Sequence, residues 1–101
     1  MKNVLLLARK GIDLDQVRAL VDTSNLTLFA GTGFADARRA LEQARMDLVI
    51  MGAGLDLDVR LSIVRHIFVH SSGTSVHMKD RDSGPQGMLP FVAAVLGALG
   101  R

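Results

Sequence analysis

Short apolar runs alternate along the chain with amphipathic stretches of about a dozen residues. Each pair is typical of a buried strand followed by a helix, and the pattern occurs four times. The predicted strands are Val4–Ala8, Leu26–Ala30, Leu48–Met51 and Thr74–Met78. The predicted helices run from about Leu14 to Val21, from Ala35 to Arg45, from Leu57 to Val69, and from Gln86 almost to the C-terminus. Strands that alternate with helices predict an α/β fold built on a parallel sheet.

The residue types in each predicted strand indicate its position in the sheet. A strand that is buried on both faces is solidly apolar, whereas an edge strand carries polar positions. The first and third strands are entirely apolar, but the second contains Thr27 and the fourth contains Ser75 and His77. With right-handed crossovers, this difference predicts the strand order 2-1-3-4 and helices on both faces of the sheet. We therefore expect one domain over residues 1–101, with a three-layer α/β/α fold and a shortened flavodoxin-like sheet.

Four positions after the predicted strands invite comparison with a known family. Arg9 and Lys10 follow the first strand, Gly52 follows the third, and Lys79 follows the fourth. The arrangement resembles, in topology, the receiver domain of response regulators, which has one more βα unit. In that family an acidic pair takes the place of Arg9 and Lys10, a phosphorylated Asp takes the place of Gly52, and a Lys ends the last strand. Because receivers need carboxylates to hold Mg²⁺ and accept the phosphoryl group, the resemblance implies a receiver-like module that is not phosphorylatable.

Basic residues and glycines gather at the predicted carboxyl edge of the sheet. Open α/β sheets bind ligands there, because loops from several strands converge at the reversal of strand order. The converging residues are Arg9, Lys10, Gly52, Gly54, Lys79 and Arg81. Glycines before helices would also bring main-chain N–H groups to this crevice, so we predict a site for a small anion, a phosphate-bearing molecule or a nucleotide. Alternatively, the cations are solvated beside Asp80 and Asp82, and the glycines serve only tight turns.

The third predicted helix carries two apolar stripes, which predicts a surface for self-association. The stripe expected to cover the sheet consists of Leu57, Leu61, Val64 and Phe68. The second stripe, expected on the opposite side, consists of Val59, Ile63 and Ile67. The last helix, which includes Val95, has no charge on any side, and surplus apolar surface usually marks an interface. We therefore expect a homodimer through the third helix, the last helix or the fourth strand, with Val59, Ile63, Ile67 and Val95 at the interface. Alternatively, the small residues of the last helix let a monomer bury it.

Two further motifs carry weak signals. Gly31-Thr32-Gly33 follows a strand and precedes a helix, as in dinucleotide-binding fingerprints, but Asp36 replaces the third glycine, which favours an ordinary turn. His66 and His70 lie one helical turn apart and could share a metal with His77. They lack the Glu of the His-Glu-x-x-His motif, so solvated or interfacial histidines are favoured, and we predict neither a metal nor another cofactor.

Composition narrows the functional classes. The 101 residues include no Cys, which excludes disulfides, thiolate zinc sites, iron–sulfur clusters and a Cys nucleophile. The net charge of +2 and the four aromatic residues, all Phe, argue against nucleic-acid binding. The longest apolar stretch, residues 88–100, is too short to cross a bilayer, so we expect a soluble cytoplasmic protein without membrane contact.

Two functional hypotheses follow. The first is a non-catalytic, receiver-like interaction or regulatory module that acts as a homo-oligomer, with or without another protein partner. The alternative is a small protein, enzymatic or not, that binds an anion or nucleotide in the crevice at the carboxyl edge.

Overall fold

The computed structural model describes residues 1–99, so residues 100 and 101 lie outside the described part. Its strands are β1 (Lys2–Leu7), β2 (Leu26–Gly31), β3 (Leu48–Met51) and β4 (Ser75–Met78). Its helices are α1 (Leu14–Leu20), α2 (Phe34–Gln43), α3 (Leu57–His70) and α4 (Met88–Leu99), and a 3₁₀ turn at Pro85–Gly87 precedes α4. Every predicted strand and helix is present, with bounds that differ by at most a few residues. In the described part of the chain, every helix falls short of what a membrane span requires.

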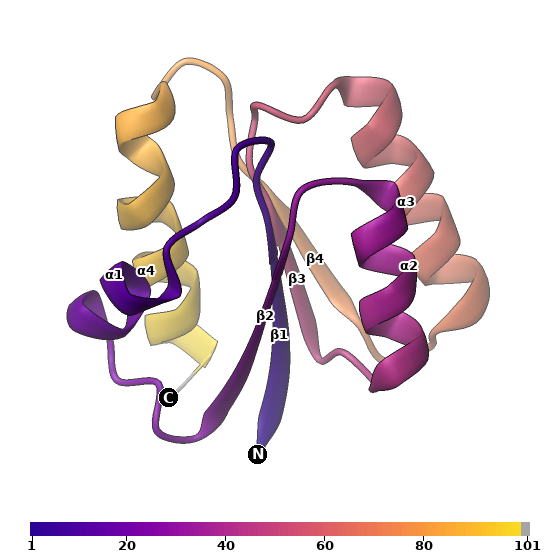
Figure 1. Ribbon diagram of the computed structural model, residues 1–101, viewed down its shortest axis with the longest axis horizontal. Helices are drawn as coiled ribbons and strands as arrows, with labels where there is room; N and C mark the ends of the chain where they lie inside the picture. Colours follow the sequence, from indigo (N-terminus) through magenta and orange to yellow (C-terminus); the bar gives the residue numbers. More distant parts are fainter. Residues whose placement is uncertain (100–101) are drawn as a thin grey trace.

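The four strands form one parallel sheet in the order β2-β1-β3-β4, as the strand compositions predicted. Leu7 pairs with Gly31 on one side and with Met51 on the other, and Met51 pairs with Met78. The strands therefore end level with one another, which brings the loops that follow them to one edge. The α1 and α4 helices cover one face of the sheet, and α2 and α3 cover the other (Figure 1). This is the predicted three-layer α/β fold.

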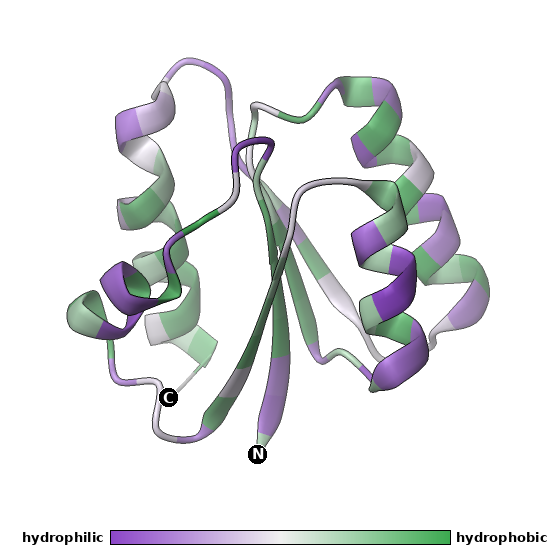
Figure 2. Ribbon diagram, viewed as in Figure 1, coloured by the Kyte–Doolittle hydropathy of each residue, from purple (hydrophilic) through white to green (hydrophobic). Residues whose placement is uncertain are grey.

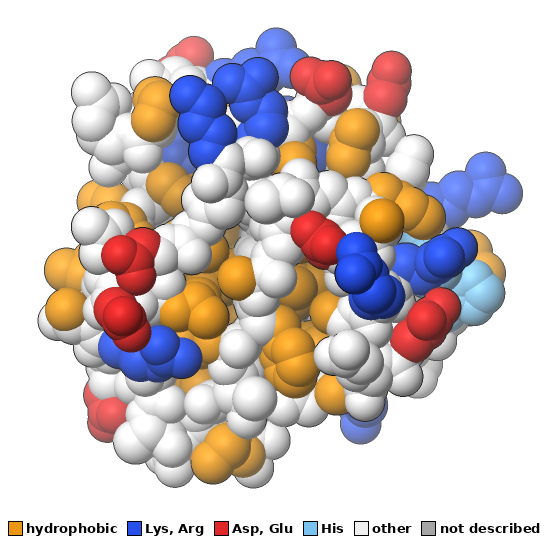
Figure 3. All heavy atoms as spheres, in the orientation of Figure 1, with side chains coloured by type: hydrophobic (Ala, Val, Ile, Leu, Met, Phe, Trp, Pro, Cys, Tyr) orange, Lys and Arg blue, Asp and Glu red, His pale blue; other side chains and the backbone are white. Residues whose placement is uncertain are grey.

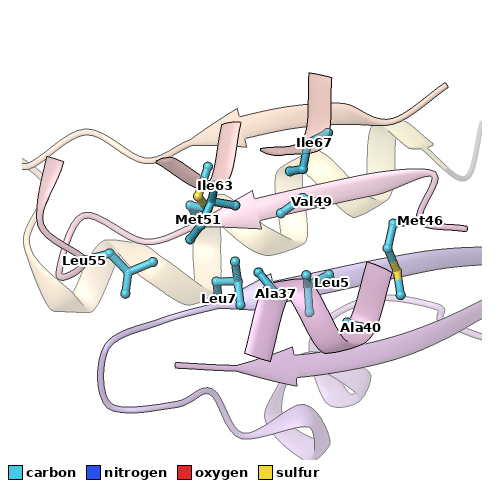
Figure 4. Close-up of a cluster of buried hydrophobic side chains, with 10 residues drawn as sticks. All are labelled: Leu5, Leu7, Ala37, Ala40, Met46, Val49, Met51, Leu55, Ile63 and Ile67. Carbon is cyan, nitrogen blue, oxygen red and sulfur yellow. The ribbon is translucent and has the colours of Figure 1, made fainter. Parts of the chain in front are cut away.

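Two apolar clusters hold the layers together, one on each face of the sheet. Successive side chains of a strand point to opposite faces, so the central strands supply both clusters. Figure 2 shows these strands mostly in the colour of hydrophobic residues. The cluster under α2 and α3 takes Leu5, Leu7, Val49 and Met51 from the sheet (Figure 4). The cluster under α1 and α4 takes Val4, Leu6, Leu48 and Ile50. Burial of each such side chain stabilises the fold by about 1.5–3 kcal/mol.

Local hydrogen bonds fix where the helices begin. Asp13 caps α1, because its carboxylate accepts a hydrogen bond from the main-chain N–H of Asp15 at 2.9 Å. Asp36, in the first turn of α2, accepts hydrogen bonds from the main-chain N–H of Thr32 at 2.8 Å and from its hydroxyl at 3.1 Å. These bonds lower the pKa of Asp36, to which Arg39 adds a smaller effect. The Gly31-Thr32-Gly33 motif is therefore a strand-to-helix turn, as the sequence favoured.

The assignment of the two stripes on α3 was wrong. Ile63 and Ile67 are 1% and 0% exposed in the core, whereas Leu57, Leu61 and Phe68 are 47%, 49% and 63% exposed. Val59 and Val95 are half-buried and pack against the two core clusters. The predicted interface residues therefore serve the monomer's own core. Both stripes are apolar, so periodicity could not tell which one faces the sheet; the contact between α2 and α3 decides it.

Candidate anion-binding site

A cavity of about 400 Å³ opens at the carboxyl edge of the sheet, between the loops that follow β1, β3 and β4. All six residues predicted for the crevice line it: Arg9, Lys10, Gly52, Gly54, Lys79 and Arg81. Figure 3 shows Lys and Arg side chains gathered at the top of the molecule, where the strands end in Figure 1. The structure thus brings together residues that are up to 72 positions apart, between Arg9 and Arg81.

The loop after β1 presents Arg9 and Lys10 on a tight turn. The N–H of Gly11 donates to the carbonyl oxygen of Ala8 at 2.9 Å, which closes the turn. Gly11 has a φ angle of 81°, a left-handed conformation that glycine adopts without strain. Both basic side chains are exposed at this turn and border the cavity. The N–H of Ala8 bonds to the carbonyl of Gly31 at 3.2 Å, which anchors the loop to the end of β2.

Lys79 occupies the inner position of the cavity. Its N–H donates to the carbonyl of Met51 at 2.9 Å, which extends the pairing of β3 and β4 by one residue. Its side chain is only 4% exposed, although it carries an ammonium group. The ammonium Nζ donates to the carbonyl oxygen of Asp80 at 3.0 Å. An ammonium has three N–H donors, so this single carbonyl leaves most of its hydrogen-bonding capacity for another acceptor.

The carboxylate next to Lys79 in sequence, that of Asp80, is engaged with another partner. Among residues 1–99, the ion pairs within 4 Å are Arg18–Asp15, Arg38–Glu42 and Arg39–Asp36, and none of them includes a cation of the cavity. The carboxylate of Asp80 accepts the N–H and the hydroxyl of Ser83, both at 2.9 Å. These two bonds lower the pKa of Asp80, and the charge of Lys79 lowers it further by a smaller amount. Lys79 therefore forms no ion pair within 4 Å with Asp80, and the residue is buried rather than solvated as the alternative interpretation expected.

A second buried cation lies next to Lys79. Arg60, on α3, is 6% exposed, and its Nη1 donates to the carbonyl oxygen of Lys79 at 3.3 Å. Its Nε is buried without a hydrogen-bond partner among the described residues. Arg60 was not predicted from the sequence. The available signal was its spacing of three and seven residues from Ile63 and Ile67, which shows a core-facing position only once the face of α3 is known.

Three of the cavity glycines, Gly11, Gly52 and Gly84, use their N–H groups in main-chain hydrogen bonds rather than for a ligand. The N–H of Gly52 donates to the carbonyl of Leu7 at 2.8 Å, so it does not face a ligand as predicted. A Cβ at Gly52 would lie 3.2 Å from Sδ of Met88, and one at Gly54 would lie 3.4 Å from Cβ of Arg9. The glycines let the loops approach closely, and basic side chains must supply most of the ligand contacts. Met88 and Pro85 add apolar lining that the sequence analysis did not assign.

The three histidines do not come together. His66 and His70 are adjacent on α3, with ring centroids 4.4 Å apart, and His66 also meets the edge of Phe34 at 5.6 Å. They line a second cavity of about 550 Å³ with the C-terminal end of α2. His77 pairs with Ile50, whose side chain belongs to the opposite core cluster. Within residues 1–99, no group of three or more His, Asp or Glu side chains is placed to hold a metal ion.

Comparison of the chain with family models, curated proteins and solved structures finds no match. The geometry of the cavity is therefore the best indication of function.

Proposed function

We propose that this protein binds a small, phosphate-bearing anion in the carboxyl-edge cavity. The observation that carries the proposal is Lys79, a buried ammonium that lines the cavity and has no carboxylate within 4 Å among residues 1–99. Removing a charge from water costs several kcal/mol unless a counter-charge and hydrogen bonds compensate. A bound anion supplies both. Arg9, Lys10 and Arg81 surround the same space and add to the positive potential.

The shape and lining of the cavity narrow the ligand class. Its volume of about 400 Å³ falls within the usual range for small-molecule sites. The apolar side chains of Met88 and Pro85 lie in the same cavity as the four cations. This combination favours a phosphate ester whose organic part contacts the apolar side, such as a sugar phosphate or a mononucleotide, over a free inorganic ion.

The proposal is for binding rather than for catalysis. Among the described residues, the cavity lining includes no Ser, Thr, His, Asp or Glu. The usual pairs of nucleophile and general base are therefore not assembled at this site. A site that binds a ligand without transforming it is typical of a regulatory module. The anion-binding hypothesis is therefore compatible with the regulatory role expected from the resemblance to receivers.

Binding of AMP, with adenosine as the matched probe that lacks phosphate, tests the proposal by isothermal titration calorimetry. We expect AMP to bind and adenosine to bind much more weakly. Lys79→Met removes the ammonium while keeping an apolar side chain of similar length, and should weaken AMP binding at least tenfold, because a charge-assisted contact is worth about 1.5–3 kcal/mol. Arg81→Met, at an exposed position, should weaken binding by a smaller factor.

The control variant is Lys2→Met, at the opposite end of β1, which should bind AMP as the wild type does. If Lys79→Met and Lys2→Met lose AMP affinity by the same factor, the assignment of the site is overturned. Native mass spectrometry of gently purified protein gives an independent measurement, since a tight natural ligand is retained as added mass. The absence of both AMP binding and retained mass would overturn the phosphate-ester proposal.

The second candidate function is the homo-oligomeric interaction module. Two of its predicted interface residues, Ile63 and Ile67, are buried. A different stripe of α3 is exposed and apolar, through Leu57, Leu61 and Phe68. That observation is independent of the cavity and supports self-association at a different surface from the one predicted.

A further inference from the structure

One flank of α3 is apolar and exposed. Leu57, Leu61 and Phe68 are 47%, 49% and 63% exposed. Val64, half-buried between them, also packs partly against the core cluster under α2 and α3. Intervals of four, three and four residues place these side chains on one continuous stripe along the helix. Contiguous exposed apolar surface often marks an interaction site. The four residues are called the α3 stripe below.

The α3 stripe lies on the flank of α3 that is turned away from α2. The opposite flank packs on α2, where His66 meets Phe34, and the face between the two flanks carries Ile63 into the core. At the sheet, Val76 packs in the same core cluster as Ile63, so Met78, two residues further along β4, points to the same side. Met78 is 44% exposed. The apolar surface therefore extends from α3 toward β4, the edge strand that lies behind β3 in Figure 1.

The sequence of α3 is complementary to itself when the helix is reversed. Leu57 and Phe68 are equally far from the midpoint of the α3 stripe, and so are Leu61 and Val64. If two copies of α3 pack antiparallel about a two-fold axis at this midpoint, Leu57 lies opposite Phe68 of the second copy. Leu61 then lies opposite Val64 of the second copy. Every apolar position meets an apolar position, which is the condition that an isologous interface imposes.

The charges beside the stripe pair across the same axis with a small offset. Asp58 and Arg65 are exposed and lie along the same edge of the α3 stripe, seven residues or about two helical turns apart. In antiparallel helices, residues on the same edge face each other, so Asp58 faces Arg65 of the second copy. The two positions are offset by two residues, or about 3 Å along the helix axes, which the long Arg side chain spans. The reverse contact repeats across the axis. Within residues 1–99, neither side chain has an ion-pair partner within 4 Å in its own chain. Any other register of the two helices loses the apolar matches, the charge matches or both.

We infer that the protein forms a two-fold symmetric homodimer through the α3 stripe, with the two α3 helices antiparallel. This inference does not depend on the proposed ligand, because the cavity opens at the ends of the strands and none of the stripe residues lines it. The dimer carries two separate copies of the candidate anion site.

Sedimentation velocity or light scattering after gel filtration tests the dimer. We expect the wild type to show twice the mass of one chain, and Leu61→Glu to reduce the mass to that of a monomer, because two carboxylates would be buried near the two-fold axis. Leu61 is 49% exposed in one chain, so the variant keeps its fold, which circular dichroism checks. The matched control is Leu20→Glu, on α1 in the opposite layer, where Leu20 is 56% exposed and the dimer mass should not change.

Reversal of the charges tests the register. Asp58→Arg and Arg65→Asp should each weaken dimerisation by about tenfold, because each change places like charges opposite each other twice in the dimer. The double variant with both changes should return to near the wild-type affinity. Asp58 and Arg65 are too far apart in one helix to restore each other within a monomer, so rescue reports contact between copies.

Three results would overturn the inference: a wild-type monomer at every concentration measured, a dimer that survives Leu61→Glu, or a double charge variant without rescue. The failure of this inference leaves the anion site intact, since Lys79→Met should bind AMP poorly while keeping the dimer mass. The two proposals can therefore fail separately.

Discussion

Arg60 of α3 donates a hydrogen bond from Nη1 to the main-chain carbonyl oxygen of Lys79, at 3.3 Å, and both side chains are buried. The bond ties the helix on one face of the sheet to the residue whose ammonium lines the cavity. Arg60 does not itself line the cavity, so it is a positioning residue. Two buried cations in sequence-distant elements thus bond to consecutive main-chain carbonyls, Arg60 to that of Lys79 and the Lys79 ammonium to that of Asp80.

Arg60→Met should affect the site more than the fold. The variant loses a charged donor to the Lys79 carbonyl, which costs stability, but it also removes a buried Nε that lacks a partner, which recovers part of that cost. We expect a net loss of about 1 kcal/mol, or a fall in Tm of about 5 °C, and a several-fold loss of AMP affinity. Arg38→Met, at an exposed position on α2, is the control and should change neither quantity. Unchanged AMP affinity with a lower Tm would show that Arg60 is only structural.

Truncation of the two kinds of apolar residue on α3 tests the corrected orientation of the helix. Ile63→Ala should lower the free energy of unfolding by about 2–5 kcal/mol, because it leaves a cavity in the core. Leu61→Ala should change it by less than about 0.5 kcal/mol in the monomer, because that side chain is half exposed. Urea denaturation at low protein concentration measures both values. The opposite ranking would contradict the orientation of α3.

Replacement of two glycines by alanine should have opposite effects. A Cβ at Gly31 would lie 2.5 Å from Cβ of Asp36 and 3.1 Å from Cδ2 of Leu7, so Gly31→Ala should destabilise the fold by about 1–3 kcal/mol. A Cβ at Gly97, within α4, meets no atom within 4 Å, so Gly97→Ala should stabilise the helix by about 0.5–1 kcal/mol. The Tm values of the two variants measure both effects. A higher Tm for Gly31→Ala would contradict the close contact between Gly31 and Asp36.

The Asp80–Ser83 turn should respond to acid. Hydrogen bonds from Ser83 hold the pKa of Asp80 below its ordinary value of 3.8. A carboxylate with a lowered pKa in the folded state stabilises the fold above its unfolded pKa and loses that contribution as the pH falls through the folded value. Ser83→Ala removes the hydroxyl bond but keeps the main-chain bond, so we expect the pKa of Asp80 to rise part of the way toward 3.8. Carboxyl-detected NMR titration measures this directly, and an unchanged pKa would mean that the hydroxyl bond is not formed.

Local pattern and elementary topology were enough to predict the architecture and the members of the candidate site. Solid apolar runs at Val4 and Leu48 marked central strands, because only a strand covered on both faces tolerates such composition. Given the predicted strand order, Arg9 and Lys79 were expected to lie close together, because the carboxyl ends of parallel strands lie at one edge of a sheet. The sequence by itself therefore determined the fold class, the strand order and which loops converge.

Only the tertiary structure decided the orientations within that frame. An apolar stripe on either side of α3 satisfies the helical period, and packing against α2 and the sheet selected Ile63 for the core and left Leu61 exposed. The same packing buried Arg60 beside Lys79, and the approach of β1 to β3 bonded the N–H of Gly52 to Leu7 instead of leaving it free. Periodicity specifies which residues share a face, but the direction of that face depends on contacts between elements that are distant in the sequence.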